Sequence, residues 1–268
     1  MSQHKELYGK YLPFYDPDEY YPDEINFEDI FFLSWYFMSM IQYDEIIINP
    51  VSSINTTIGA GIYNILNREY ELAPENMKLK EFFKVRPGED NFFNLRDIME
   101  WIMLDSWLLH FNRTDYETDI VEALSDKTED TTRRNVESYI YEITDSYSVS
   151  GYTPLLAKRG KDWLAYIQGS EHPLFEDILG ISEKKTGYYF FMGKDIDYMQ
   201  FQHIATDRVL QVTTRSLNSP EEFKAGKTIN FLGFVKWKND WWFSGASANL
   251  GRDADMIKKE KNSESSRS

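Results

Sequence analysis

The spacing of hydrophobic residues changes once along this chain, near Gly187. Before that glycine, apolar residues recur at intervals of three and four, the spacing of one face of an α-helix. After it, alternating patterns of β-branched and aromatic residues bounded by turn formers are typical of short β-strands. We therefore predict an α+β protein, in which an N-terminal all-helical domain is followed by a small antiparallel five-stranded β-barrel-like module.

In the helical part, the pattern predicts helices near residues 27–43, 50–71, 95–111, 134–147 and 154–168. The first is apolar on nearly every face, which predicts deep burial. The second is amphipathic, with isoleucines spaced by three and four at Ile54, Ile58, Ile62 and Ile65. For the last, we expect a buried stripe made of Leu155, Leu156, Trp163 and Ile167.

In the second part, strands are expected near residues 188–192, 198–204, 208–214, 228–237 and 241–247. Five short strands cannot form a stable open sheet with both faces in water. They should therefore curl into a small barrel or pack on the helices.

The predicted organisation has four parts. Residues 1–24 form an extended, proline-rich and acidic lead-in, residues 25–186 the helical domain, and residues 187–250 the β domain. Residues 251–268 are a charged, Ser-rich tail that we expect to be disordered. The segment 126–135 is the best candidate for a mobile loop within the helical domain.

Composition argues against several classes of partner and chemistry. The 268 residues carry a formal net charge of −15, which repels phosphate backbones and anionic membrane surfaces. The densest basic group before the tail, Lys158, Arg159 and Lys161, is typical of a solvated helix face. The absence of cysteine excludes disulfides and thiolate chemistry, and no apolar run approaches the roughly 18 residues of a membrane helix. We expect a cytoplasmic protein that binds neither nucleic acid nor membrane.

The motifs of common enzymes are missing. The four histidines, His4, His110, His172 and His203, have no metal-ligand spacing, and each is expected to be a polar residue at the edge of an element. The segment Gly59-Ala60-Gly61 lies in a helical pattern, which favours close helix packing over phosphate binding. The acidic run 16–24 is interrupted by prolines and lacks the glycine of a calcium loop. The sequence therefore predicts no cofactor, no metal and no identifiable catalytic residue.

The segment FLGFVKWKNDWWFSGAS, residues 231–247, holds three tryptophans within six positions. A tight turn at Asn239-Asp240 would pair Trp237 with Trp242 and place both in the interior of a curled sheet. Trp241 and Phe243 would then be half-exposed, and they are our candidate partner-binding residues. The alternative is that all three tryptophans serve only packing.

Several blocks resemble one known family: LYGKYLPFYDPDEYY, the WYF helix near 35–37, GKDWLAYIQGSEHPL, GFVKWKNDWWFSG and EKNSESSR. They are similar to an uncharacterised bacterial family, the domain of unknown function 3843. The resemblance implies no activity, cofactor or catalytic residue. It implies that members continue before the first block and after the last, so that this chain would be an interior piece or a shortened member.

Two hypotheses about function follow. The first is a non-enzymatic acidic adaptor of a bacterial cytoplasm that binds another protein, or a missing part of a longer homologue, because Tyr and Trp dominate interface hot spots. The second is an enzyme of unfamiliar type, a hydrolase using carboxylates as acid and base in a site between the two domains. Two converging carboxylates in a deep pocket would favour the enzyme, and an aromatic surface patch would favour binding.

Overall fold

The protein was analysed as a computed structural model, which describes residues 25–41, 48–69, 72–106, 109–125, 133–217, 223–226, 228–249, 257, 259 and 261. The chain forms two compact units, Met1–Lys80 and Glu81–Ser268. Each unit is described by itself. The expected lead-in and most of the expected tail and mobile loop lie outside the described residues.

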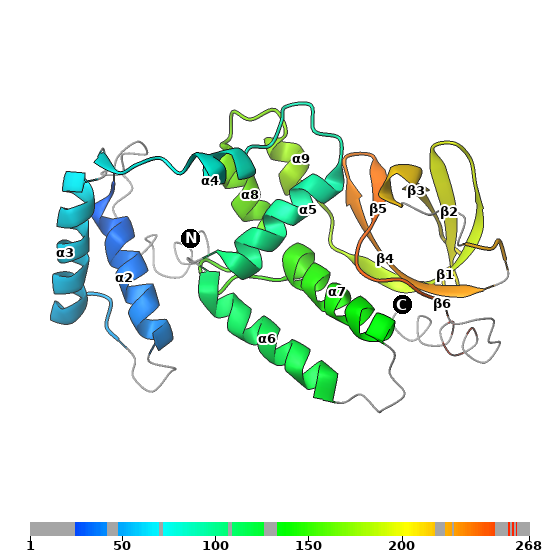
Figure 1. Ribbon diagram of the computed structural model, residues 1–268, viewed down its shortest axis with the longest axis horizontal. Helices are drawn as coiled ribbons and strands as arrows, with labels where there is room; N and C mark the ends of the chain where they lie inside the picture. The colour runs from blue at the N-terminus through cyan, green and yellow to red at the C-terminus, as the bar shows by residue number, and fades with distance from the viewer. Residues whose placement is uncertain are drawn as a thin grey trace. The chain divides into compact units, whose positions relative to one another are not determined.

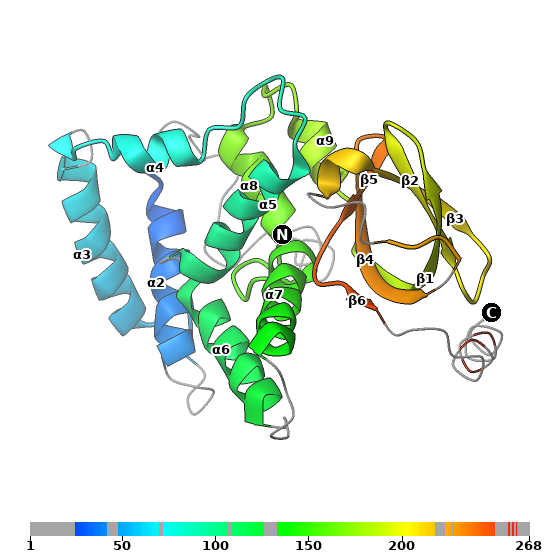
Figure 2. The ribbon, with the colours of Figure 1, turned by 45° about the vertical axis from the view of Figure 1, so that its right-hand side comes forward.

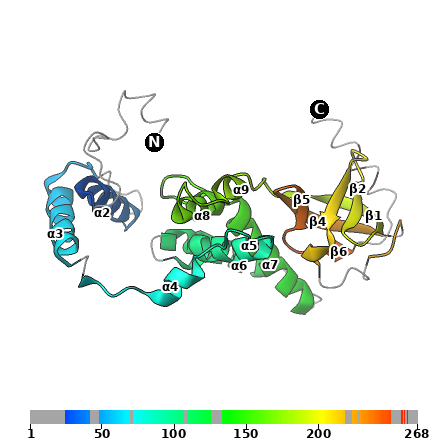
Figure 3. The same ribbon diagram turned by 90° about the horizontal axis from the view of Figure 1, so that it is seen from above.

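The first unit contains a helical hairpin of α2 (Phe27–Ile41) and α3 (Ser53–Glu69), which lie side by side in Figures 1 and 3. The helices approach closely at Gly59, where an added Cβ would lie 2.8 Å from the ring of Phe31. Close helix packing at this glycine is therefore confirmed. The expected deep burial of α2 is wrong, because only Phe31, Ser34 and Tyr36 of this helix are buried.

In the second unit, one of the expected helices is divided in two. The single helix expected over 95–111 is wrong: α5 (Phe92–Glu100) is followed by a π-helical turn (Trp101–Asp105), and α6 begins only at His110 (His110–Ser125). The π turn ends where the Ser106 N–H donates to the carbonyl of Trp101, at 2.9 Å.

The remaining helices are α4 (Met77–Phe82), which spans the division between the units, α7 (Arg133–Ser150), α8 (Gly160–Gln168) and α9 (Phe175–Leu179). The helix expected near 134–147 is thus confirmed as α7, whereas α4 and α9 were not predicted. None of the described helices combines the length and apolar character needed to cross a lipid bilayer.

The strands form a closed five-stranded barrel, which confirms the predicted α+β fold class (Figure 2). They are β1 (Lys185–Lys194), β2 (Tyr198–His203), β3 (Val209–Thr213), β4 (Ile229–Trp237) and β5 (Asp240–Phe243), with a short β6 (Ala248–Asn249) beside β4. Pairing of β1 with β4 closes the barrel. The contact between β3 and β5 is parallel, so the barrel is not wholly antiparallel.

The two faces of the β4–β5 hairpin are both buried, but in different places. The interior of the barrel is an aromatic and aliphatic cluster that includes Phe201, Phe234 and Phe243. On the other face, Trp237 and Trp242 are each 1% exposed and pack outside the barrel on Phe92 of α5, with ring centroids 6.4 and 6.2 Å away. Their core position is confirmed, whereas their placement in the barrel interior is wrong.

The register of this hairpin also differs from the expected one. The turn is Lys238-Asn239, with Lys238 at φ +53°, so Trp237 pairs with Asp240 and Val235 with Trp242. The shift is by two residues, and side chains alternate with a period of two. The same side chains therefore share a face as expected, although the face of Trp237 and Trp242 lies outside the barrel.

Candidate functional site

The sequence-predicted site residues lie at the barrel. Trp241 is half-buried against the barrel core, and its ring lies under the Nζ of Lys185, 5.3 Å from the ring centroid. Phe243 is only 8% exposed, and its ring lies 5.0 Å from that of Phe234 inside the barrel. Half-exposure of Phe243 is therefore wrong, because this face of the hairpin curls around the interior. A binding role for Trp241 stays a prediction.

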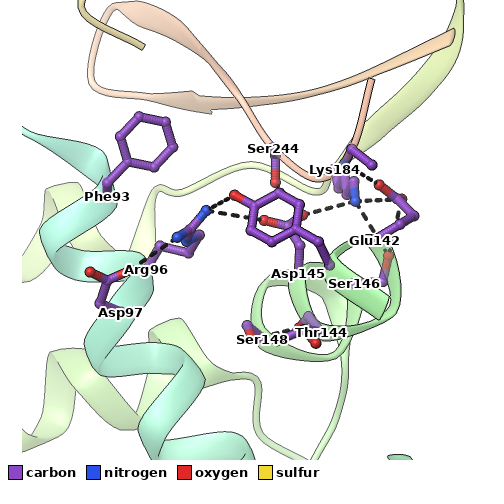
Figure 4. Close-up of polar contacts among 12 residues, drawn as sticks. Phe93, Arg96, Asp97, Glu142, Thr144, Asp145, Ser146, Ser148, Lys184 and Ser244 are labelled. Atoms are coloured by element: carbon purple, nitrogen blue, oxygen red, sulfur yellow. Dashed lines mark hydrogen bonds and ion pairs between the residues drawn. The ribbon is translucent and has the colours of Figure 1, made fainter. Parts of the chain in front are cut away.

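A buried charge cluster, formed by Arg96, Glu142, Asp145, Lys184 and Ser244, lies where α5 and α7 meet the barrel (Figure 4). The Lys184 side chain is 4% exposed, and its Nζ lies 2.6 Å from Glu142 Oε1 and 2.8 Å from Asp145 Oδ2. The hydroxyl of Ser244 donates to the same Asp145 oxygen at 2.6 Å. One cation thus pairs with two carboxylates of α7, while Asp145 Oδ1 is buried and has no hydrogen-bond partner among the described residues.

Local sequence explains why these groups meet. Glu142 and Asp145 are three residues apart on α7, so they share a side of that helix. Glycine makes room for them: an added Cβ at Gly245 would lie 2.0 Å from Glu142 Oε2 and 2.4 Å from Lys184 Nζ. The Ala246 N–H then donates to Glu142 Oε2 at 2.8 Å. The segment after β5 is therefore held directly by α7.

Arg96 of α5 completes the cluster. Its guanidinium carbon lies 5.1 Å from the Phe93 ring centroid and 5.3 Å from that of Tyr141, whose hydroxyl accepts a hydrogen bond from Nη1. Nη1 is also 4.0 Å from Asp145 Oδ1. Burial opposes the charged form, but Tyr141, Asp97 and Asp145 together raise the pKa of Arg96. Arg96 is therefore a permanent positive charge within the cluster.

The cluster can hold elements together, but its geometry offers little for catalysis. Glu142 and Asp145 do converge between the helices and the barrel, as the enzyme hypothesis required, yet Lys184 engages both. An open cavity of about 340 Å³ in this unit has a different lining: Phe82, Lys84, Arg86, Glu89, Asn94, Asp97 and Ile98. Moving the barrel away from α5 and α7 would leave buried charges without their partners, which is strongly destabilising. The cluster therefore fixes the barrel to these two helices.

An exposed aromatic surface is the second feature, built on the turn that precedes α8. The Thr153 N–H donates to the Lys158 carbonyl at 2.8 Å, and the Thr153 hydroxyl donates to the Leu155 carbonyl at 2.7 Å. Leu156 and Ala157, which lie between Leu155 and Lys158, have φ values of +61° and +48°, which residues other than glycine rarely adopt. The turn is thus strained and is held by a buried threonine.

We name this surface the aromatic turn patch and define it as Tyr152, Leu156, Lys158, Arg159, Tyr166 and Ile167. Its two tyrosines are 57% and 58% exposed, and its aliphatic residues are 41% and 47% exposed. The guanidinium of Arg159 lies 4.6 Å from the ring centroid of Tyr152, and Lys158 Nζ lies 4.5 Å from that of Tyr166. The patch therefore contains two exposed rings, each covered by a cation from the turn before α8.

Sequence reasoning missed this patch because it extended the helix over the turn. Leu155 is buried as expected, but Leu156 and Ile167 are exposed, so the expected buried stripe is wrong. The helix begins at Gly160, where the Asp162 carboxylate accepts a hydrogen bond from the Arg159 N–H at 2.9 Å. An acidic residue three positions after the cap is a start signal that could have located this boundary.

The histidines whose side chains are described make polar contacts with protein groups. His172 Nε2 lies 3.0 Å from the Val85 carbonyl oxygen, and His203 Nδ1 lies 3.1 Å from the Thr206 hydroxyl. His4 and the side chain of His110 lie outside the described part of the chain. Both described histidines therefore have the edge positions that the sequence predicted.

Fold and site together define an α+β protein whose helices are joined to a small closed barrel by buried ion pairs. The family model described as a protein of unknown function, DUF3843, matches residues 1–188. The chain belongs to this family, as the resemblance predicted, and the match ends within β1. Searches of curated proteins and of solved structures each returned no match.

Proposed function

We propose that the protein is a non-enzymatic adaptor of the bacterial cytoplasm that binds another protein through the aromatic turn patch. The observation that carries the proposal is the pair Tyr152 and Tyr166, two tyrosines more than half exposed, each with its ring against a cation. Tyrosine and arginine are enriched among the residues that dominate binding energy, because they bury large areas and also form hydrogen bonds.

The strained turn supports the same function. Left-handed backbone at Leu156 and Ala157 costs free energy and persists only where the surrounding structure imposes it. Here the hydrogen bonds of Thr153 hold the turn, and Leu156 within it is exposed. Backbone strain of this kind collects at ligand-binding surfaces, because it presents a side chain in one fixed position.

The charges of the patch indicate what a partner should offer. Arg159 is already bound to Glu183, with Nη2 and Oε1 2.8 Å apart, whereas Lys158 lies over the Tyr166 ring. A carboxylate next to an apolar side chain would meet Lys158 and the exposed Leu156 together. The absence of cysteine supports a reducing compartment, and a missing part of a longer homologue is one form that the partner could take.

Site-specific photocrosslinking in living cells tests the proposal. A photoreactive phenylalanine at Tyr166 should give a discrete crosslinked protein, and the double substitution Tyr152→Ala with Leu156→Ser should abolish it. Tyr139 of α7, which is 42% exposed, is the matched control position. Equal crosslinking from positions 166 and 139, or a product that survives the double substitution, would refute a specific patch. Thermal unfolding of each variant checks that the fold is kept.

The hydrolase alternative has less support from the geometry. Its two carboxylates, Glu142 and Asp145, are both occupied by Lys184, and Asp145 is 1% exposed. A general acid or base must reach a proton of the substrate by hydrogen bonding, directly or through one water. The adaptor therefore remains the function that we propose.

A further inference from the structure

The first unit carries an exposed row of apolar side chains along α3, separate from the patch and from the function proposed for it. Six of them are between 37% and 66% exposed: Val51, Ile54, Ile58, Ile62, Ile65 and Leu66. Ile54, Ile58, Gly61 and Ile65 follow one another at intervals of four, three and four residues, the spacing of the seam between two paired helices. We call these six residues together with Gly61 the α3 seam.

Gly61 is the most informative residue of the seam. Glycine is a poor helix former, and it stands at the middle of α3 (Ser53–Glu69). Gly59 is explained by its contact with Phe31, but a Cβ added at Gly61 would meet nothing within 4 Å. A glycine in the centre of an exposed seam permits another helix to approach closely at that point.

The charge distribution indicates which helix this is. Residues 30–41 and 51–67 contain no Asp, Glu, Lys or Arg, although 27% of the chain is charged. A charged partner would find nothing to pair with here. Two copies of a chain with a net charge of −15 repel each other, and this uncharged face is a region where that repulsion is small.

We propose that two copies of the protein associate through the α3 seam, around a two-fold axis that passes near Gly61. Each copy then supplies α2 and α3, and the four helices form a bundle that covers the exposed isoleucines. Because the contact is isologous, Gly61 of one copy lies against Gly61 of the other, where the absence of a side chain brings the helices together.

Sedimentation equilibrium of the full chain tests the proposal. The unaltered protein should be a dimer, and Ile58→Glu should weaken association by about 30-fold or more, the effect of losing a central interface side chain. Gly61→Leu should weaken it too, although leucine is the better helix former and leaves an isolated α3 at least as stable. Ile196→Glu, at a site that is 90% exposed between β1 and β2, is the control and should change nothing.

Cysteine crosslinking gives a second measurement, because the chain has no cysteine of its own. Oxidation should convert Gly61→Cys into a covalent dimer and leave Ile196→Cys monomeric. A monomeric unaltered protein would overturn the proposal. So would a dimer that forms equally well with Ile58→Glu and Gly61→Leu, because its interface would then lie elsewhere. Loss of crosslinking at Tyr166 with an intact dimer would refute the proposed adaptor function alone.

Discussion

The buried charge cluster and the α3 seam invert the usual distribution of residues. In the cluster, Lys184 and Asp145 are 4% and 1% exposed, whereas on the seam Ile54 is 66% exposed. Each arrangement is unfavourable by itself, because ions prefer water and isoleucine does not. The two regions differ in whether other described residues offset this cost. The buried charges have oppositely charged partners at 2.6 to 2.8 Å, whereas the isoleucines of the seam are left in contact with solvent.

This contrast separates an internal fastening from a candidate interface. A buried ion pair whose carboxylates on α7 also accept hydrogen bonds from the segment after β5 has its partners in the same chain. An apolar row without charges beside it instead has the properties of a surface that another molecule covers. Burial alone would have selected the cluster as the functional site. The exposed apolar side chains point instead to the seam.

Breaking the cluster should give the largest effect. Lys184→Met leaves the buried Asp145 and the partly buried Glu142 without their shared cation, and it should lower the free energy of unfolding by about 3–5 kcal/mol. Urea denaturation measures the loss. Lys80→Met is the matched control: Lys80 and Glu75 are 2.8 Å apart but 63% and 64% exposed, so the cost should stay below about 1 kcal/mol. Equal losses for the two lysines would contradict the compensation argument.

The two faces of the β4–β5 hairpin extend the comparison to aromatic residues. Trp242→Ala should cost about 3–5 kcal/mol, because its ring is buried against Phe92 and Trp237. Trp241→Ala should cost much less, since Trp241 lies at the margin of the barrel core. Urea melts of both variants test this order, and a larger loss for Trp241→Ala would show that the hairpin faces are assigned wrongly.

Much of the fold could be predicted because the sequence pattern is local. The alternation after Gly187 located each strand of the barrel to within a few residues, since side-chain alternation depends only on the pleat. It could not tell which face of β4 and β5 is the inside of the barrel. Both faces are apolar, and the choice depends on the closure of β1 on β4 and on Phe92, far away in the sequence.

The sites were less predictable for the same physical reason. Lys184 meets carboxylates 42 and 39 positions earlier, and no spacing rule connects residues so far apart. The aromatic turn patch was hidden because Pro154 to Lys158 have a helical pattern, and a side-chain hydrogen bond of Thr153 overrides it. The α3 seam, in contrast, was visible as an isoleucine repeat. Only the structure shows that the repeat is exposed.

The smallest expected effect concerns Glu100, a partly buried carboxylate whose charge is affected by Arg96 and Asp145 of the cluster. Burial raises the pKa of Glu100; Arg96 lowers it, while Asp97, Asp105 and Asp145 add to the rise. A carboxyl group whose pKa is raised on folding stabilises the protein below its unfolded pKa, and that contribution is lost as the pH rises through the folded value. Glu100→Gln should therefore make the protein more stable at neutral pH, and the gain should shrink at a pH below the usual range of glutamate. Urea melts at both values measure the difference. If the stability gained by Glu100→Gln instead grew on acidification, the folded protein would stabilise ionised Glu100, as it does the carboxylates paired with Lys184. The distinction between charges with and without a close partner would then fail at this residue.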